Sequence, residues 1–342
     1  MSETLEERRA RYGPLVVDEM RETVGESPAG LFGWMRYHLG WEDREGAAVD
    51  ARRGKLLRPV AVLLASELVG GDIEQAVPAA AAVELVHNFS LLHDDIEDQS
   101  ESRHGRSTVW TFAGEAQAIN TGDGMFTLAR LAMHRLLDRR VEERRVIEAM
   151  RELDEACLRL VEGQYLDIRF ESLDAVTRDE YLTMASGKTA AMFAAPFAIG
   201  ALLGGADGQT VSAFREFGRR TGLAFQAVDD VLGIWGDPVV TGKPASDDLR
   251  SRKMTLPVIA ALESGGDEAE TLARGYASDD SSERHLATLT GLIERLEGRT
   301  VTEQLAADQV REALAALAVA GLDDGALALC SQFTTVATGR QF

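Results

Sequence analysis

The chain has 342 residues, of which 45% are hydrophobic, and its 36 basic and 56 acidic residues give a formal net charge of −20. So acidic a surface disfavours nucleic acid as a partner and electrostatic docking on anionic lipid, because both require clusters of lysine and arginine. A small phosphorylated substrate is not excluded, since local cations or a bound metal can reverse the charge of one site.

Helical patterns occupy nearly the whole chain, and no alternating pattern is long enough to predict a sheet. The polar stretches 236–248 and 266–283 are predicted to be loops or surface excursions. No repeat or linker divides the sequence, so we expect one all-α domain over residues 1–342. The predicted helices are 59–70, 76–98, 125–137, 143–168, 179–203, 211–235 and 254–264, with further amphipathic helices from residue 283 onward.

The sequence indicates a cytoplasmic protein without a membrane anchor. The N-terminal residues are charged and lack the apolar core of a signal peptide. The richest apolar run, residues 190–203, is shorter than a membrane-spanning helix. Cys157 and Cys330 lie far apart and lack metal-ligand spacing, so we expect two buried thiols in a reducing compartment.

An acidic cluster closes the helix predicted over 76–98. Asp94 and Asp98 are four residues apart and Asp95 and Asp98 are three apart, so the carboxylates share one helix face. Acids at a helix C-terminus oppose the helix dipole and repel one another. Mg²⁺, which binds one or two carboxylates together with substrate phosphates, would offset that cost. A solvated acidic helix end is the alternative.

A second acidic cluster follows about 135 residues later. Asp229 and Asp230 again end an apolar run, and Lys243 and Lys253 lie nearby. Lysines and metal ions together form a phosphate-binding set. Two helix ends of similar design predict that the clusters face each other across one cavity.

Cations near these clusters are candidate anion ligands. Lys55 and Arg58 precede an apolar helix, whose N-terminus favours anions, although an ordinary charged loop is the alternative. Arg103 lies just past the first cluster and either binds phosphate or neutralises Asp98. Lys188 stands in an apolar helix, where it needs a partner or a route to the surface.

Three further polar residues are weaker candidates. His87 precedes the first cluster and is either a binding or a structural histidine. Gln164 and Asp167 either support the site or lie on the surface of a long helix.

Over about residues 50–260 the sequence resembles the trans-isoprenyl diphosphate synthases, or polyprenyl synthetases, closest in type to bacterial geranylgeranyl diphosphate synthases. The motifs GKLLRP, HDDIED, GQYLD, GKT and FQAVDD…GD…GK…DL…KMTLP occur in the family's order. The resemblance implies the isoprenoid synthase fold, an antiparallel bundle of helices around a deep cavity, in a homodimer.

The resemblance also implies a reaction. Isopentenyl diphosphate would condense with an allylic diphosphate (dimethylallyl, geranyl or farnesyl) after Mg²⁺-assisted ionisation, with three ions per site. Asp94, Asp98 and Asp229 are the implied metal ligands. The other implied catalytic residues are Asp95, Asp230, Arg103, Lys188, Lys243, Thr189 and Gln226. The implied substrate-binding residues are Lys55, Arg58, His87, Phe89, His104, Gln164, Asp167, Phe225 and Lys253.

The sequence departs from the family pattern at two positions. His104 stands where a second arginine usually follows Arg103 and contacts isopentenyl diphosphate, and histidine is mostly neutral at pH 7. Arg106 could compensate. Gly233 stands where many members carry a third aspartate in the second cluster.

The resemblance also implies a product length, which depends on the size of the side chains about one turn before the first aspartate. Phe89, with the small Ser90 beside it, suggests a C20 product, and a C15 product is its closest rival. Phe89 as an ordinary core residue is the alternative.

Two other functions are compatible with these motifs. A terpene synthase or cyclase would ionise one allylic diphosphate without isopentenyl diphosphate; His104 favours it, and Lys55 and Arg58 argue against it. A non-catalytic partner subunit is disfavoured by the intact aspartates of both clusters.

Overall fold

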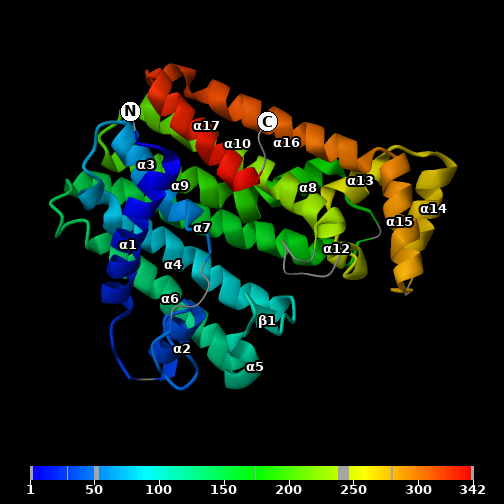
Figure 1. Ribbon diagram of the computed structural model, residues 1–342, viewed down its shortest axis with the longest axis horizontal. Helices are drawn as coiled ribbons and strands as arrows, with labels where there is room; N and C mark the ends of the chain where they lie inside the picture. The colour runs from blue at the N-terminus through cyan, green and yellow to red at the C-terminus, as the bar shows by residue number, and fades with distance from the viewer. Residues whose placement is uncertain are drawn as a thin grey trace. The chain divides into compact units, whose positions relative to one another are not determined.

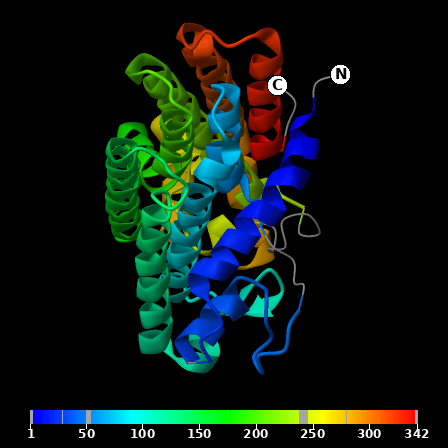
Figure 2. The same ribbon diagram turned by 90° about the vertical axis from the view of Figure 1, so that its left-hand side faces the viewer.

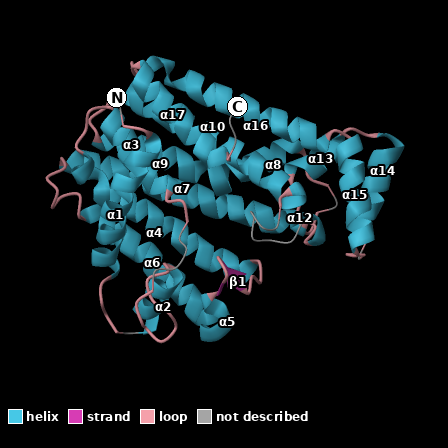
Figure 3. Ribbon diagram, in the orientation of Figure 1, coloured by secondary structure: helices cyan, strands magenta, loops and turns pink. Residues whose placement is uncertain are grey.

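The computed structural model describes residues 3–28, 30–49, 54–173, 175–237, 246–278 and 280–339. Helices dominate it, which confirms the predicted all-α class (Figure 1). Within these ranges the only strands are β1 (Ser102–Arg103) and β2 (Arg106–Ser107), which pair antiparallel (Figure 3).

The chain divides into two compact units. The first comprises Met1–Glu155, Ala195–Arg215 and Val319–Leu329, and the second comprises Ala156–Ala194, Glu216–Ala318 and Cys330–Phe342. Four helices contribute residues to both: α7 (Glu143–Phe170), α9 (Ala191–Leu203), α10 (Gly208–Trp235) and α17 (Asp324–Thr338). The single domain inferred from the sequence stays a prediction.

The first unit is built around α4. The carboxylate of Asp72 accepts the Glu74 N–H at the start of this helix, which is a standard N-cap. Its centre, residues 79–83, consists of alanines and one valine that are fully buried, so neighbouring helices pack closely against it. The first-unit helices are α1 (Leu5–Val24), α2 (Gly30–His38), α3 (Leu57–Leu68), α4 (Ile73–Glu97), α5 (Val109–Ala113) and α6 (Glu115–His134). Helices α1, α3 and α6 pack against α4, and the two views show α4 and α6 side by side (Figures 1 and 2).

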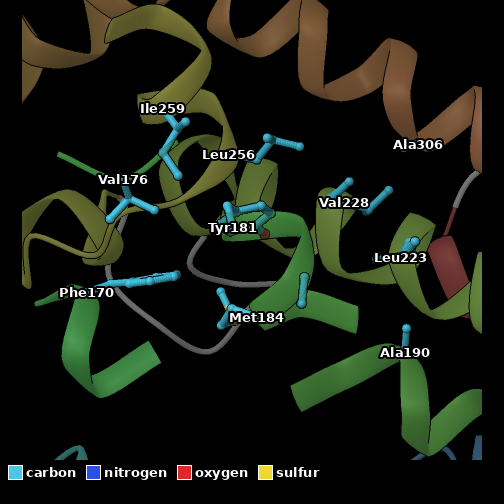
Figure 4. Close-up of a cluster of buried hydrophobic side chains, with 12 residues drawn as sticks. Phe170, Val176, Tyr181, Met184, Ala190, Leu223, Val228, Leu256, Ile259 and Ala306 are labelled. Atoms are coloured by element: carbon cyan, nitrogen blue, oxygen red, sulfur yellow. The ribbon is translucent and has the colours of Figure 1, made fainter. Parts of the chain in front are cut away.

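The second unit packs α8, α10 and α13 around a hydrophobic cluster (Figure 4). Tyr181 and Met184 of α8, Val228 of α10, and Leu256 and Ile259 of α13 belong to it. The second-unit elements are α8 (Arg178–Ala185), the π-helical turn η1 (Ser186–Ala190), α12 (Asp247–Arg250), α13 (Leu256–Glu263), α14 (Gly266–Tyr276), α15 (Glu283–Arg295) and α16 (Gly298–Ala316). The 3₁₀ turn η2 (Leu317–Val319) follows α16.

The predicted helices are all present, but two expectations about their limits were wrong. Residues 266–283 are not a polar excursion, because α14 lies there and buries Ala269, Leu272 and Tyr276. Three buried residues at helical spacing are enough to dock a helix whose other positions are polar. Helix α6 begins ten residues before the predicted position 125, since its first turns are polar.

The apolar run at 190–203 ends a continuous helical stretch that agrees with the helix predicted over 179–203. Residues Arg178–Leu203 form 26 continuous helical residues that are long and apolar enough to cross a membrane, by length and composition only. The most apolar window of this stretch is 78% buried inside the protein. Such burial is typical of a core helix, and Cys157 and Cys330 are buried as well.

Candidate active site

The C-terminal end of α4 separates its aspartates by burial. Asp94 is half-buried and Asp98 is exposed, whereas Asp95 is only 1% exposed. Arg103 Nε donates a hydrogen bond to Asp95 Oδ1 at 2.8 Å, and Arg103 Nη2 forms an ion pair with the same oxygen at 2.8 Å. The other oxygen, Oδ2, is buried without a hydrogen-bond partner among the described residues. Burial raises the pKa of Asp95 to about 6, against the opposing effect of Arg103.

The β1–β2 hairpin aims Arg103 back at α4. His104 and Gly105 form its two-residue turn, and both have positive φ (52° and 76°), as a type I′ turn requires. Arg106 donates from its two terminal nitrogens to the carbonyls of Tyr37 and Glu42, both at 2.7 Å, and stacks 4.0 Å from the Tyr37 ring centroid. Arg106 therefore braces the hairpin, and these contacts do not support its replacing the missing second arginine.

A pocket of about 100 Å³ lies beside this hairpin. Its charged lining residues and histidines are His38, Glu84, His87, Asp95, Arg103, His104 and Arg106. Arg58 adjoins it, with Nη1 3.4 Å from Nε2 of His87. Lys55 is exposed. Two arginines and two carboxylates line the pocket, and Arg58 at its edge adds a third arginine, so this region is more basic than the strongly acidic chain as a whole and can accept an anion.

Burial dominates the titration of the groups around this pocket. It lowers the pKa of Arg58 to about 10 and that of His38 to about 3, and it holds the pKa of His87 well below its ordinary value. Both histidines are therefore neutral at pH 7. His38 escaped sequence reasoning, because nothing in the sequence links it to the first cluster.

In the second unit a π-helical turn presents Lys188 and Thr189. Single π turns in α-helices occur often at functional sites. Gly163 of α7 permits the close approach, because a Cβ there would lie 2.1 Å from the Lys188 backbone nitrogen. The ammonium of Lys188 forms an ion pair with Asp167, one turn after Gly163. Two of the predicted residues therefore meet directly.

A buried hydrogen-bonded network links Thr189 to the second acidic cluster. The Thr189 hydroxyl donates to Gln226 Oε1 at 2.5 Å, and Gln226 Nε2 donates to Asp230 Oδ1 at 2.9 Å. Asp230 Oδ2 accepts from the Tyr181 hydroxyl at 2.5 Å and from the Leu256 N–H at 2.8 Å. Burial raises the pKa of Asp230 to about 7 in spite of these donors.

Sequence reasoning missed Tyr181, although a signal existed. Tyr181 stands seven residues, or two helical turns, before Lys188, so the two side chains lie on the same helix face. A site role for Lys188 therefore makes Tyr181 a candidate as well. Figure 4 shows Tyr181 within the hydrophobic cluster, between Leu256 and Met184. Its hydroxyl is thus held among apolar side chains with Asp230 as its acceptor.

Asp229 is more exposed than the neighbouring Asp230, just as Asp94 is more exposed than Asp95. Its side chain is exposed, while Asp230 is 3% exposed. The structure also explains Gly233. A Cβ there would lie 1.8 Å from Oδ2 of Asp248, so the carboxylate of Asp248 occupies the space that a third aspartate of α10 would need.

The remaining predicted residues are less informative. Phe225 is half-buried, and its ring centroid lies 5.3 Å from that of Phe193. Gln164 and Lys253 are half-buried. Lys243 lies outside the described residues. The facing of the two clusters across one cavity stays a prediction.

The carboxylates fit a hard divalent cation bound together with substrate. In the described part of the chain, no group of three His, Cys, Asp or Glu side chains forms a metal centre by itself. Mg²⁺ needs only one or two carboxylates when waters and substrate phosphates complete its shell. Asp94, Asp98 and Asp229 have that chemistry and are more exposed than Asp95 and Asp230, which are buried.

Comparisons with known proteins identify the family. The sequence model of polyprenyl synthetase matches residues 47–293. A geranylgeranyl diphosphate synthase of Mycobacterium tuberculosis is 42% identical over 314 residues, covering 92% of this chain and 87% of that protein. A (2E,6E)-farnesyl diphosphate synthase of Mycobacterium bovis is 43% identical over 91% of this chain and 86% of that protein.

Solved structures agree with this assignment. A polyprenyl synthetase from Streptomyces coelicolor A3(2) superimposes with a TM-score of 0.89 at 39% identity, covering 96% of this chain and 98% of that one. A geranylgeranyl pyrophosphate synthase from Corynebacterium glutamicum, complexed with isoprenyl diphosphate and magnesium, gives 0.80 at 27% identity and 98% coverage of both chains.

The chain belongs to the polyprenyl synthetase family, the trans-isoprenyl diphosphate synthases. It has the isoprenoid synthase fold and is a prenyltransferase. These relatives are named as diphosphate synthases, and nothing favours the terpene cyclase alternative.

Proposed function

We propose that this prenyltransferase condenses isopentenyl diphosphate with allylic diphosphates to make geranylgeranyl diphosphate (C20), with farnesyl diphosphate (C15) as the next candidate product. The observation that carries the proposal is the pocket beside the acidic end of α4, which Arg103 and Arg106 line and Arg58 adjoins. In a chain of net charge −20, such a pocket favours a diphosphate.

The first unit would hold isopentenyl diphosphate. Arg103 and His104 line the pocket, and Arg58 lies against His87 at its edge. The buried carboxylate of Asp95 fixes the orientation of Arg103, so this cation is positioned before substrate binds. Exposed Lys55 would supply a further ammonium.

The second unit would stabilise the allylic cation. The Thr189 hydroxyl donates a hydrogen bond to Gln226, so the lone pairs of its oxygen can face positive charge. Gln226 cannot rotate freely, since its amide donates to Asp230. Lys188, oriented by Asp167, would stabilise the departing diphosphate, and so would Lys243.

In the reaction the allylic C–O bond breaks and its electron pair leaves with the diphosphate. The double bond of isopentenyl diphosphate then attacks the allylic carbon, and the departed diphosphate takes the proton that restores a double bond. We propose Asp94, Asp98 and Asp229 as ligands of divalent metal, three Mg²⁺ per site. Bound Mg²⁺ would neutralise diphosphate charge as the bond breaks.

We propose a homodimer, supported by an exposed apolar face on α7. Leu158, Val161, Tyr165 and Ile168 are 61%, 53%, 63% and 45% exposed, and their spacing of three, four and three residues places them on one face. So large an apolar stripe favours burial against a second copy. Sedimentation equilibrium should give a dimer for the wild type and a monomer for Tyr165→Glu; a monomeric wild type would refute the proposal.

We also propose one functional domain in the cytoplasm. The two buried free thiols support a reducing compartment, because disulfides dominate in oxidising ones.

Product analysis tests the function. The purified chain is incubated with Mg²⁺ and dimethylallyl, geranyl or farnesyl diphosphate, each with and without isopentenyl diphosphate. We expect longer diphosphates only when isopentenyl diphosphate is present, with C20 predominant. A hydrocarbon formed from an allylic diphosphate alone would instead identify a terpene synthase.

A further inference from the structure

His38, at the C-terminal end of α2, lines the pocket beside the β1–β2 hairpin. Its ring is hydrogen-bonded to the side chain of Asn88 on α4. Asn88 Nδ2 donates to the backbone carbonyl of Glu84 at 2.8 Å and to Glu84 Oε1 at 3.2 Å. The amide nitrogen of Asn88 is therefore committed to Glu84. Its carbonyl oxygen is left to meet His38, so His38 donates an N–H to Asn88.

The second ring nitrogen of His38 determines how this side chain interacts with an anion. A neutral imidazole carries one N–H, and His38 uses that group on Asn88. The other nitrogen of the neutral ring then carries a lone pair, which repels the oxygens of an anion in the pocket. Protonation converts this nitrogen into a charged donor, so the ring stabilises a bound anion only after it has gained a proton.

His87 lines the same pocket but has a different partner. Its Nε2 lies 3.4 Å from Nη1 of Arg58. A guanidinium has donors only, so this nitrogen of His87 is an acceptor and Arg58 disfavours a proton on it. Burial, and after it Arg58, lowers the pKa of His87. Of the two neutral histidines, His38 is therefore the one whose second nitrogen can gain a proton beside an anion.

The groups packed around His38 explain why an anion would change its protonation. Burial lowers the pKa of His38 to about 3, and positive charge on the hairpin, first that of Arg103, lowers it further. Helix α1 contributes apolar Val17 and Met20 to the pocket, and α6 meets α2 at Gly124. The titratable and charged groups that line or adjoin the pocket are Tyr37, Arg58, Glu84, His87, Asp95, Arg103, His104 and Arg106. One unit charge at about 4 Å changes a proton affinity about 1000-fold at an effective dielectric constant of about 20, and a diphosphate carries more than one such charge.

We propose that His38 is a substrate-binding residue that takes up a proton from solvent when isopentenyl diphosphate enters the pocket. The inference rests on the proposed function, in which the diphosphate of this substrate lies beside Arg103 and Arg58. In the free enzyme the ring of His38 is neutral and donates to Asn88. In the complex the second nitrogen carries the added proton and donates it to a diphosphate oxygen. Because binding then consumes a proton, affinity is highest at low pH and falls as pH rises.

Isothermal titration calorimetry counts the protons. Isopentenyl diphosphate is titrated into the wild type and His38→Gln at pH 7 with EDTA, in two buffers of different ionisation enthalpy. Glutamine keeps an N–H donor for Asn88 but does not titrate. His38→Asn repeats the test with a shorter amide, and melting curves show whether each variant is folded. His134→Gln is the matched control, because His134 is exposed on α6 and does not line the pocket.

We expect the wild type and His134→Gln each to take up about one proton more on binding than His38→Gln does. Between pH 6.5 and 8.5, the ratio of the wild-type Kd to the His38→Gln Kd should rise by up to about tenfold per pH unit. Equal proton counts for the wild type and the His38 variants would overturn the inference and leave the proposed function standing.

A second measurement keeps the test independent of the variants. If neither His38 variant folds, nitrogen NMR of the His38 ring in the wild type decides the question. A charged ring with isopentenyl diphosphate bound would support the inference, and a neutral ring would overturn it. A wild type that binds no isopentenyl diphosphate, with or without Mg²⁺, would overturn the proposed function and this inference with it.

Discussion

Two helices, α4 and α10, carry a pair of adjacent aspartates near their C-terminal ends, but the buried aspartate of each pair has different partners. At the end of α4, buried Asp95 is held by one cation, Arg103, and keeps one oxygen without a partner among the described residues. At the end of α10, buried Asp230 accepts hydrogen bonds from three neutral donors. In both pairs the first aspartate is the more accessible one. In each pair, therefore, the second aspartate is buried against protein donors and the first is the more exposed.

The largest effect should come from the accessible aspartates. We expect Asp229→Ala and Asp94→Ala each to lower kcat about 10³–10⁴-fold, because the diphosphate would lose a metal ligand. Thermal unfolding should change little, since neither side chain is fully buried. A steady-state assay and a melting curve check both halves of the prediction. Loss of folding in either variant would break the distinction between the members of a pair.

Asp230→Ala should instead destabilise the protein. Removing the carboxylate leaves the Tyr181 hydroxyl and the Leu256 N–H buried without their acceptor. We expect a loss of about 3–4 kcal/mol in the free energy of unfolding, measured by urea denaturation. Tyr181→Phe, which removes one donor only, should cost about 1 kcal/mol. Equal stability of Asp230→Ala and Asp229→Ala would contradict the account.

Arg103→Ala should have a smaller effect at the α4 end. It leaves the Asp95 carboxylate buried and unpaired, at a cost of about 2 kcal/mol; this is less than for a fully buried pair, because the Arg103 side chain is 30% exposed. The KM for isopentenyl diphosphate should rise as well, and Arg103→Lys should recover part of the stability. An unchanged urea midpoint for Arg103→Ala would count against the role of Asp95.

The pH dependence of stability tests the environment of the two buried aspartates. Burial raises the pKa of Asp95 to about 6 and of Asp230 to about 7, from an ordinary value of 3.8. Between the ordinary pKa of 3.8 and each raised pKa, the folded chain binds more protons than the unfolded chain. The contribution of these groups to stability is therefore full below about pH 4 and is lost as pH rises to about 7, with a slope of at most about 1.4 kcal/mol per pH unit for each group.

The Asn variants isolate that contribution. Asp95→Asn and Asp230→Asn lack the titration, so the stability of the wild type relative to each variant should fall as pH rises over this window. Urea midpoints measured from pH 4 to 8 give the difference. A pH-independent difference would contradict the direction assigned to these pKa shifts.

The smallest effect concerns the third position of the second cluster. A glycine-to-alanine change inside a helix normally stabilises by about 1 kcal/mol. We expect Gly233→Ala to destabilise by about that amount, because the added Cβ meets the Asp248 carboxylate. Gly291→Ala in α15 is the control and should stabilise, since its Cβ meets only the flexible end of Arg295. Stabilisation by Gly233→Ala would show that Asp248 moves aside freely.

The sequence was informative where chemistry follows local pattern. Helical periodicity predicted the all-α class, and the motif order predicted the family. The spacing of Asp94 and Asp98 placed them on one face. What the pattern lacked were contacts between distant segments. The Tyr181–Asp230 bond joins residues 49 apart, and Asp248 reaches Gly233 from another helix. Helix α14 was missed because only three of its residues are buried.

We propose that aspartates from both clusters act on one diphosphate through a divalent metal. A double-mutant cycle measures it: inorganic diphosphate is titrated calorimetrically in Mg²⁺ against the wild type, Asp94→Ala, Asp229→Ala and the double variant. We predict strong coupling: the Kd of the double variant for diphosphate should be no higher than that of the single variant with the higher Kd. Losses that simply add, or diphosphate binding that ignores Asp229→Ala, would contradict it.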